Sequence, residues 1–203
     1  MTATIIDLLR HGQPEGGEIF RGATDVALSD TGWQQMRAAT QELAGWQRVL
    51  TSPMQRCQAF ADEISQRLHI PSHTHHDLRE ISFGDWDGMA FQAVSAQYGS
   101  LFNDYWRDPI NNTPPNAEPM PSFCQRVQQA FWQSVEAHQG QHLLLVVHGG
   151  VIRAILSEVM KSEAISLMRY EVPYACLSRI KIYHDDGRHW PQLVFHNRAS
   201  SLR

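Results

Sequence analysis

Leu8-Leu9-Arg10-His11-Gly12-Gln13 ends an apolar run near the start of this 203-residue chain. A second apolar run, from Leu143 to Val147, also ends in a histidine followed by glycine, His148-Gly149-Gly150. Both runs are typical of short buried strands. An arginine fork suits a phosphate group, and a neighbouring histidine can attack phosphorus. We therefore expect the two imidazoles, His11 and His148, to converge on one site.

The rest of the chain alternates predicted strands with predicted helices. Strands are expected at residues 5–9, 48–51, near 73–77 and at 142–147. Helices are expected from Ser29–Gly32 to about Ala44, from Ser52-Pro53 to about Leu68, over 123–138 and over about 151–160. Two antiparallel edge strands, 177–183 and 192–195, are expected around the turn Asp185-Asp186-Gly187. This order predicts a three-layer α/β/α sandwich with a mainly parallel central sheet.

A looser pattern lies between residues 83 and 122, where aromatic residues, glycines and a proline-rich run gather. We interpret this segment as a small inserted cap with short helices around 89–98 and 101–106. The length of the chain suits one sizeable core. Residues 1–203 are therefore expected to form a single domain that carries the cap.

Composition narrows the classes of partner. The net charge is −4, so no global basic field would recruit nucleic acid or an anionic membrane. The three cysteines, Cys57, Cys124 and Cys176, are odd in number and lack C-x-x-C spacing, which argues against a disulfide framework or a zinc ribbon. The chain shows neither a secretory signal pattern nor an apolar run of about 18 residues. These features together predict a cytoplasmic protein.

The expected sheet brings the polar motifs together, because ligands on largely parallel sheets bind at the carboxyl ends of the strands. His11 follows the first predicted strand, His148 follows the central one, and Arg56 lies in the first turn of the helix after the second. The helix start behind Gly149-Gly150 adds backbone N–H groups that favour an anion. This convergence predicts a phosphate site. Taken singly, either histidine also fits a structural role near a strand end.

A histidine cluster at residues 73–77 offers an alternative, a metal site. On a strand, His73, His75 and Asp77 would share one face and His76 would lie on the other. No distant partner in an ordered spacing accompanies them in the sequence. The sequence therefore favours a site that needs neither metal nor cofactor.

Four motifs carry a resemblance to a known family. They are Leu9-Arg10-His11-Gly12, the stretch Thr51-Ser52-Pro53-Met54-Gln55-Arg56-Cys57, the stretch Leu78-Arg79-Glu80-Ile81-Ser82-Phe83-Gly84-Asp85-Trp86, and Val147-His148-Gly149-Gly150. In this order they resemble the motifs of the histidine phosphatase superfamily, which includes the phosphoglycerate mutases. The resemblance runs from about residue 4 to residue 198.

The resemblance implies a role for each residue. His11 would be the nucleophile that becomes phosphohistidine, and Glu80 would protonate the leaving oxygen and then activate water. The phosphoryl oxygens would be clamped by Arg10, Arg56 and His148. Arg21 matches a loop position that can also touch substrate, and a surface role fits it equally well. No metal is required, because arginine and imidazole carry the charge that magnesium carries in other phosphoryl transfers.

The cap narrows the choice of substrate. Residues 102–108, 114–118 and 123–127 resemble the cap of the α-ribazole phosphatases of cobalamin synthesis. Asn116-Ala117-Glu118-Pro119 departs from the frequent Gly-Gly-Glu-Ser, which leaves the role of Glu118 open. Flat rings, foremost Phe102 and Trp106, would stack on the benzimidazole of α-ribazole phosphate, or would simply pack the cap.

The expected function is a metal-independent phosphomonoesterase, in particular α-ribazole-5′-phosphate phosphatase. One alternative is a broad sugar-phosphate phosphatase or a phosphoglycerate mutase-like enzyme that uses the same phosphohistidine. Another is a non-catalytic phosphate-binding module, although binding alone needs neither a nucleophile nor Glu80. The expected partner is a small phosphomonoester, and the oligomeric state stays open, with a homodimer among the alternatives.

Overall fold

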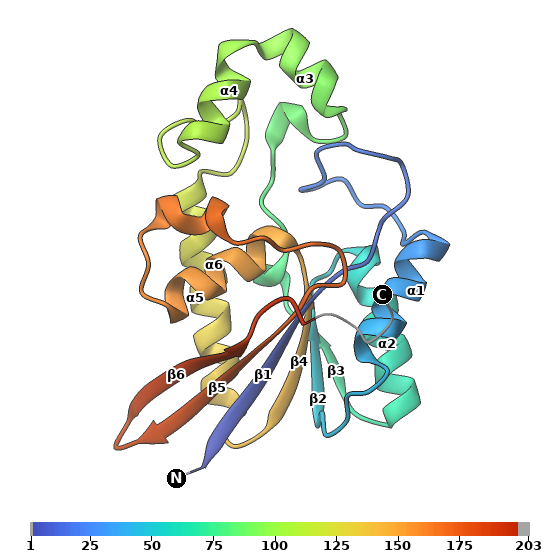
Figure 1. Ribbon diagram of the computed structural model, residues 1–203, viewed down its shortest axis with the longest axis vertical. Helices are drawn as coiled ribbons and strands as arrows, with labels where there is room; N and C mark the ends of the chain where they lie inside the picture. Colours follow the sequence, from blue (N-terminus) through green and yellow to red (C-terminus); the bar gives the residue numbers. More distant parts are fainter. Residues whose placement is uncertain (1, 199–203) are drawn as a thin grey trace.

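The computed structural model describes residues 2–198. Its centre is a six-stranded sheet in the order β3-β2-β4-β1-β5-β6 (Figure 1). The strands are β1 (Ala3–Arg10), β2 (Arg48–Thr51), β3 (Ser72–Thr74), β4 (His142–Val147), β5 (Leu177–Asp185) and β6 (Arg188–Phe195). The pairs β3–β2, β2–β4 and β4–β1 are parallel, whereas β5 and β6 run antiparallel to their neighbours. The predicted α/β fold with a mainly parallel sheet is confirmed.

Helices cover both faces of this sheet. On one face lie α1 (Asp30–Thr40) and α2 (Gln55–Leu68), and on the other lie α5 (Met120–Ala137) and α6 (Gly149–Val159) (Figure 1). Between residues 83 and 122, α3 (Phe91–Tyr98) and α4 (Ser100–Arg107) stand beyond the carboxyl ends of the central strands (Figure 1). Three short 3₁₀ helices complete the described elements: η1 (His76–Leu78), η2 (Gly84–Trp86) and η3 (Ala164–Arg169).

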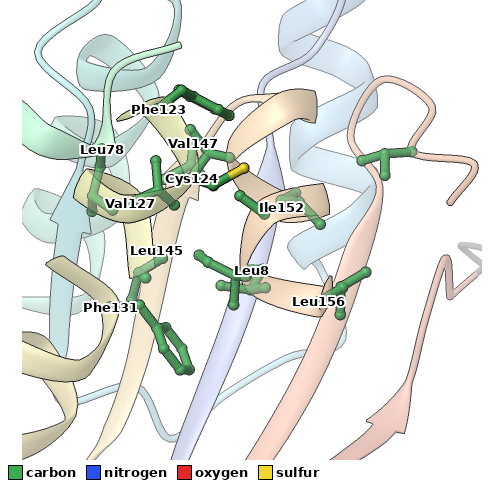
Figure 2. Packing of buried hydrophobic residues seen from close by; sticks show 14 of the residues in the cluster. Leu8, Leu78, Phe123, Cys124, Val127, Phe131, Leu145, Val147, Ile152 and Leu156 are labelled. Carbon is green, nitrogen blue, oxygen red and sulfur yellow. The ribbon is translucent and has the colours of Figure 1, made fainter. Parts of the chain in front are cut away.

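The central strand β4 feeds two hydrophobic cores because successive side chains point to opposite faces of a sheet. Leu145 and Val147 pack with α5 and α6, where Figure 2 shows them beside Phe131 and Ile152. Leu144 and Val146 pack on the other side with α1 and α2. An uninterrupted apolar run is thus the expected sequence of a strand that is buried on both faces.

Several boundaries differ from those predicted. The helix predicted to start at Ser52-Pro53 begins at Gln55, with Met54 as its N-cap. Ser52 Oγ instead accepts a hydrogen bond from Met54 N at 3.3 Å and lies 2.6 Å from His148 Nε2. The helix predicted to reach Ala44 ends at Thr40, where Leu43 N donates to Thr40 O and closes a turn. Both of the last two strands were predicted at the edge of the sheet. Only β6 is an edge strand, because β5 pairs with β1 on one side and with β6 on the other.

The predicted strand at 73–77 is wrong in its extent. β3 ends at Thr74, and η1 begins at His76, so alternation along a strand does not place His75 and Asp77 on one face. Instead, Asp77 N donates to His75 Nδ1 within a local turn. Within residues 2–198, no group of three or more histidine, cysteine, aspartate or glutamate side chains is placed to hold a metal ion.

One charged side chain interrupts the apolar β1. Asp7 is fully buried, and its two oxygens accept hydrogen bonds from Arg179 at 2.7 and 2.8 Å and from the Trp46 indole at 2.8 Å. Its Oδ2 also lies 3.0 Å from His142 Nε2. Burial alone would raise the pKa of Asp7, but these hydrogen bonds and the charge of Arg179 hold it below its usual value. A buried carboxylate is thus tolerated because both of its oxygens accept hydrogen bonds.

We predict that Arg179→Met destabilises the fold, because it leaves the Asp7 carboxylate buried with weaker compensation. The free energy of unfolding in urea at pH 7 should fall by about 2 kcal/mol, less than for a fully buried pair because solvent reaches Arg179. Since the pKa of Asp7 is lowered in the folded state, its stabilising contribution is present above about pH 4 and is lost as the pH falls.

Arg37→Met is the matched control, because Arg37 makes the same paired contact with Glu63 on the surface, with its side chain 56% exposed. It should change the unfolding free energy little. Equal destabilisation by the two variants would contradict the proposed role of the Asp7 network.

None of the helices within residues 2–198 combines the length and the apolar character needed to cross a membrane.

Candidate active site

The pairing of β1 with β4 brings the two predicted imidazoles together. Arg10 lies opposite Val147 in the parallel register, and His11 N donates to Val147 O at 2.9 Å. His11 and His148, the next residue on each strand, therefore leave the sheet side by side. Their ring centroids are 5.2 Å apart, in an edge-to-face arrangement. The predicted convergence of the two histidines is confirmed as geometry.

A cavity of about 540 Å³ opens at this edge of the sheet. Among the predicted residues, its lining includes Arg10, His11, Arg21, Glu80 and Trp106. Phe102 does not line it; its ring packs among Phe20, Trp86 and Trp106 within the cap. The expectation that Phe102 faces the substrate is thus not supported, whereas Trp106, 41% exposed, lies at the cavity.

Arg56 and His148 are fully buried and do not line the cavity. The Arg56 guanidinium donates to the backbone oxygens of Thr24, Arg21 and Gly22 at 2.9–3.3 Å, so it holds the polar loop between β1 and α1, which carries Arg21. The His148 ring packs against the Cys57 sulfur, which lies 3.6 Å from Nε2. Burial, followed by the charge of Arg56, holds the pKa of His148 well below its usual range. Its ring is therefore neutral at pH 7.

His11 is held in one tautomer. Its Nδ1 lies 2.8 Å from Gly12 O, and because a carbonyl can only accept, Nδ1 carries the proton. The lone pair is consequently on Nε2. Burial and the guanidinium groups of Arg10 and Arg56 hold the pKa of His11 well below its usual range. A neutral imidazole with an available Nε2 lone pair is the form that acts as a nucleophile.

The arginines around His11 have more donors than the protein has acceptors for them. Arg10 donates from Nη1 to Val172 O at 2.5 Å and stacks on the Tyr174 ring, with 4.3 Å from Cζ to the ring centroid. The Nε atoms of Arg10, Arg21 and Arg56 are buried without a hydrogen-bond partner among the described residues. Buried donors in native proteins are normally paired. An excess of cationic donors therefore fits an oxyanion ligand.

Arg21 reaches the cavity from the polar loop. Its Nη2 donates to Glu15 O at 2.7 Å and also to Gly17 O, so the loop itself orients the guanidinium. Of the two roles that the sequence left open, the structure therefore places Arg21 in the lining of the cavity.

Glu80 stands at the N-terminus of α6. Its Oε2 accepts a hydrogen bond from Gly150 N at 3.0 Å, and its Oε1 accepts one from Ile81 N at 3.2 Å. The sequence predicted that the N–H groups behind Gly149-Gly150 would bind phosphate, and for Gly150 this is wrong, because the Glu80 carboxylate takes that place. The helix N-terminus instead fixes the carboxylate beside the cavity.

Arg126 braces the segment that carries Glu80. It donates to the backbone oxygens of Asp77, Arg79 and Glu80 at 2.8–3.1 Å. Glu118 pairs with Arg126 through both carboxylate oxygens, at 2.6 and 2.7 Å. The side chain of Glu118, whose role the sequence left open, is thus engaged with Arg126.

Sequence reasoning missed several lining residues, among them Arg153 and Tyr174. Arg153 lies four residues after Gly149 on α6, so helical spacing puts both on one face, a signal that could have found it. Tyr174 lies in the loop before β5, where the sequence has no periodic pattern.

Arginines, a neutral imidazole and a carboxylate around one cavity define the site of a phosphomonoester hydrolase. The chain belongs to the histidine phosphatase superfamily (branch 1), whose model matches residues 6–193. Phosphatase PhoE of Bacillus subtilis, described as uncharacterized, is 27% identical over 189 residues, 91% of this chain and 92% of the relative. The adenosylcobalamin/alpha-ribazole phosphatase of Salmonella typhimurium is 27% identical over 179 residues, 86% of this chain and 89% of the relative.

The fold is also that of solved phosphatases. The mycobacterial glucosyl-3-phosphoglycerate phosphatase Rv2419c matches with a TM-score of 0.85 over 97% of this chain and 100% of that one, at 22% sequence identity. At this identity the likeness shows the fold and leaves the substrate to other arguments.

We predict that His11 stays neutral at pH 6.5 in the protein without bound phosphate. Imidazole ¹⁵N chemical shifts should show a protonated Nδ1 and an unprotonated Nε2, because burial and two guanidinium groups disfavour the second proton. The description would be contradicted if, at pH 6.5, His11 carried protons on both ring nitrogens in half or more of the molecules.

Gly150→Ala should displace Glu80, because a Cβ built on Gly150 would collide with Glu80 Oε1. Turnover of a phosphomonoester should fall by roughly a hundredfold if the carboxylate moves by about 1 Å. The thermal unfolding midpoint is measured in parallel to show that the variant is folded. Unchanged kcat in a folded Gly150→Ala protein would mean that the position of Glu80 is not important for turnover.

Proposed function

We propose that the protein is a metal-independent phosphomonoesterase that forms a phosphohistidine at His11, and that its substrate is α-ribazole 5′-phosphate. The observation that carries the proposal is the state of His11. It is neutral, its Nδ1–H is held by Gly12 O, and it lines a cavity together with Arg10, Arg21 and Glu80. A nucleophile aimed at an anion needs this combination of neutrality and surrounding positive charge.

The proposed reaction has two steps. In the first, His11 Nε2 attacks phosphorus, a P–N bond forms, the P–O ester bond breaks, and Glu80 gives its proton to the departing alcohol oxygen. In the second, Glu80 takes a proton from water as the water oxygen attacks phosphorus, and the P–N bond breaks to release phosphate and His11. Arg10 stabilises the phosphoryl oxygens in both steps. Arg56 and His148 are assigned to the same oxygens from the family resemblance, and in this structure they lie buried outside the lining of the cavity.

Glu80 is suited to this exchange by its anchoring. Gly150 N–H and Ile81 N–H hold its two oxygens, and Arg126 holds its backbone oxygen, so the carboxyl group keeps its place between the steps. General acid–base catalysis depends on such fixed geometry.

The choice of α-ribazole 5′-phosphate rests on the cap and on the Salmonella relative. Trp106 and Phe83 line the cavity and offer flat apolar surfaces to a planar base. A broad sugar-phosphate phosphatase, or a mutase-like enzyme, would use the same phosphohistidine and is distinguished by the substrate test below.

The catalytic step is tested with His11→Ala and the control His73→Ala, which removes an exposed histidine of the 73–77 cluster. Wild type and control should release phosphate in EDTA, whereas His11→Ala should lose at least about a thousandfold in kcat. Rapid quenching in base should trap an acid-labile phosphoryl group on His11. Hydrolysis by His11→Ala, or a requirement for added metal, would overturn the proposal.

The substrate is tested by comparing kcat/KM for α-ribazole 5′-phosphate, 3-phosphoglycerate, phosphoserine and ribose 5-phosphate. We expect the highest value for α-ribazole 5′-phosphate. A higher value for 3-phosphoglycerate or phosphoserine would reject the proposed substrate, and transfer of phosphate between positions of phosphoglycerate would indicate a mutase.

A further inference from the structure

A second, smaller cavity adjoins the first behind Glu80. Its volume is about 90 Å³, and most of its lining is apolar. The apolar lining comprises Ile81, Phe83, Tyr105, Trp106, Met120, Phe123, Leu167 and Met168. Four side chains line both cavities: Glu80, Phe83, Trp106 and Arg153. We call these four residues the doorway. At these residues the larger cavity, which is lined by arginines, meets the smaller apolar cavity.

Arg153 is the cation of the doorway, and the protein leaves part of it unused. Its Nε donates to Tyr170 O at 3.0 Å, which fixes the direction of the guanidinium. Its two terminal nitrogens have no acceptor, and it has no carboxylate partner, among residues 2–198. Hydrogen-bond donors oriented in this way, without a protein acceptor, are suited to a ligand oxygen.

Arg153 also lies beside Arg10. A Cβ built on Gly149 would be 3.3 Å from Arg10 Nε and 3.4 Å from Arg153 Nη1, so the two guanidinium groups are close neighbours. The two arginines differ in the cavities that they line, however. Arg10 shares the larger cavity with His11, whereas Arg153 lines both cavities at their junction.

The proposed chemistry sets the direction in which a substrate lies. Since Glu80 protonates the departing oxygen, the bridging ester oxygen must stand at Glu80, and the leaving group begins there. Glu80 belongs to the doorway, so the next atoms of the leaving group meet Arg153, Phe83 and Trp106. Beyond them lies the apolar cavity, where Leu167 and Met168 of η3 form one wall.

We propose that Arg153 and the apolar cavity form the leaving-group subsite. It takes an alcohol that presents an oxygen acceptor close to the ester, as a sugar does, and carries a planar apolar group beyond that oxygen. Arg153 is its specificity-determining residue. This inference rests on the proposed function, because the direction of the leaving group follows from the role of Glu80.

Three substrates separate the two parts of the subsite. Ribose 5-phosphate has the acceptor oxygens without a planar group, phenyl phosphate has the planar group without those oxygens, and α-ribazole 5′-phosphate has both. In Arg153→Met, kcat/KM should fall about tenfold more for the two sugar phosphates than for phenyl phosphate, as expected for one charged hydrogen bond. Arg153→Lys, which keeps a positive donor, should recover part of this difference.

Two results would overturn the role of Arg153. An equal loss of kcat/KM for all three substrates would mean that Arg153 contacts the transferred phosphoryl group. No loss of kcat/KM would mean that Arg153 does not contact the substrate. The proposed function is read separately, from phosphate release and from phosphoryl trapping on His11 in the wild-type protein. If neither occurs, the function and this inference both fail; if both occur and the ratios do not change, the inference alone fails.

The apolar cavity is tested by filling it. Met168→Trp places a larger side chain at its wall, and Ile165→Trp makes the same change on η3 at a residue that is 37% exposed and does not line the cavity. The ratio of kcat/KM for α-ribazole 5′-phosphate to that for ribose 5-phosphate should fall at least about fivefold in Met168→Trp and stay constant in Ile165→Trp. An unchanged ratio in folded Met168→Trp, with its unfolding midpoint near that of the control, would reject the apolar cavity as a subsite.

Discussion

The parallel pairing of β1 with β4 is the constraint on which the site depends. It sets Arg10 opposite Val147 and, through the hydrogen bond from His11 N to Val147 O, puts the two imidazoles next to each other. Apolar side chains of both strands pack into cores on either side of the sheet. A slip of one residue would send each core side chain to the opposite face, so burial of the strands fixes the register. The energy that folds the sheet therefore also positions His11 beside His148.

Around His11 and His148 the protein holds the positive charge of arginine side chains, and little of that charge is neutralised. Arg10 and Arg56 act on two buried imidazoles, and they lower the pKa of His11 and of His148 in addition to the effect of burial. The histidines respond by staying neutral, so the charge of the site resides on arginine. Backbone oxygens accept hydrogen bonds from some of the arginine N–H groups, but the buried Nε atoms of Arg10 and Arg56 have no acceptor within residues 2–198. A phosphoryl group supplies what this arrangement lacks, namely negative charge and several acceptors.

The sequence predicted what depends on local pattern and on the chain direction of strands. Apolar runs located β1 and β4, and the rule that ligands bind at carboxyl ends then brought Arg10, His11 and His148 to one edge. The sequence was a poorer guide to contacts for which one side chain competes with another. Ser52 looked like a helix cap, but the helix begins at Gln55 and the Ser52 hydroxyl lies 2.6 Å from His148 Nε2. Gly150 N–H looked available to an anion, but Glu80 from a distant loop accepts it. Phe102 and Trp106 looked alike, and only packing within the cap separates them.

The central claim is that His11 Nε2 faces the phosphorus atom within a ring of arginine donors. A crystal structure with vanadate, which adopts the five-coordinate geometry of a phosphoryl group in transfer, tests it most directly. We expect vanadium to be bonded to His11 Nε2, with Arg10, Arg56 and His148 on the equatorial oxygens and Glu80 beside the apical oxygen opposite His11. Vanadate bound elsewhere, or held in this cavity without a bond to His11 Nε2, would contradict the account.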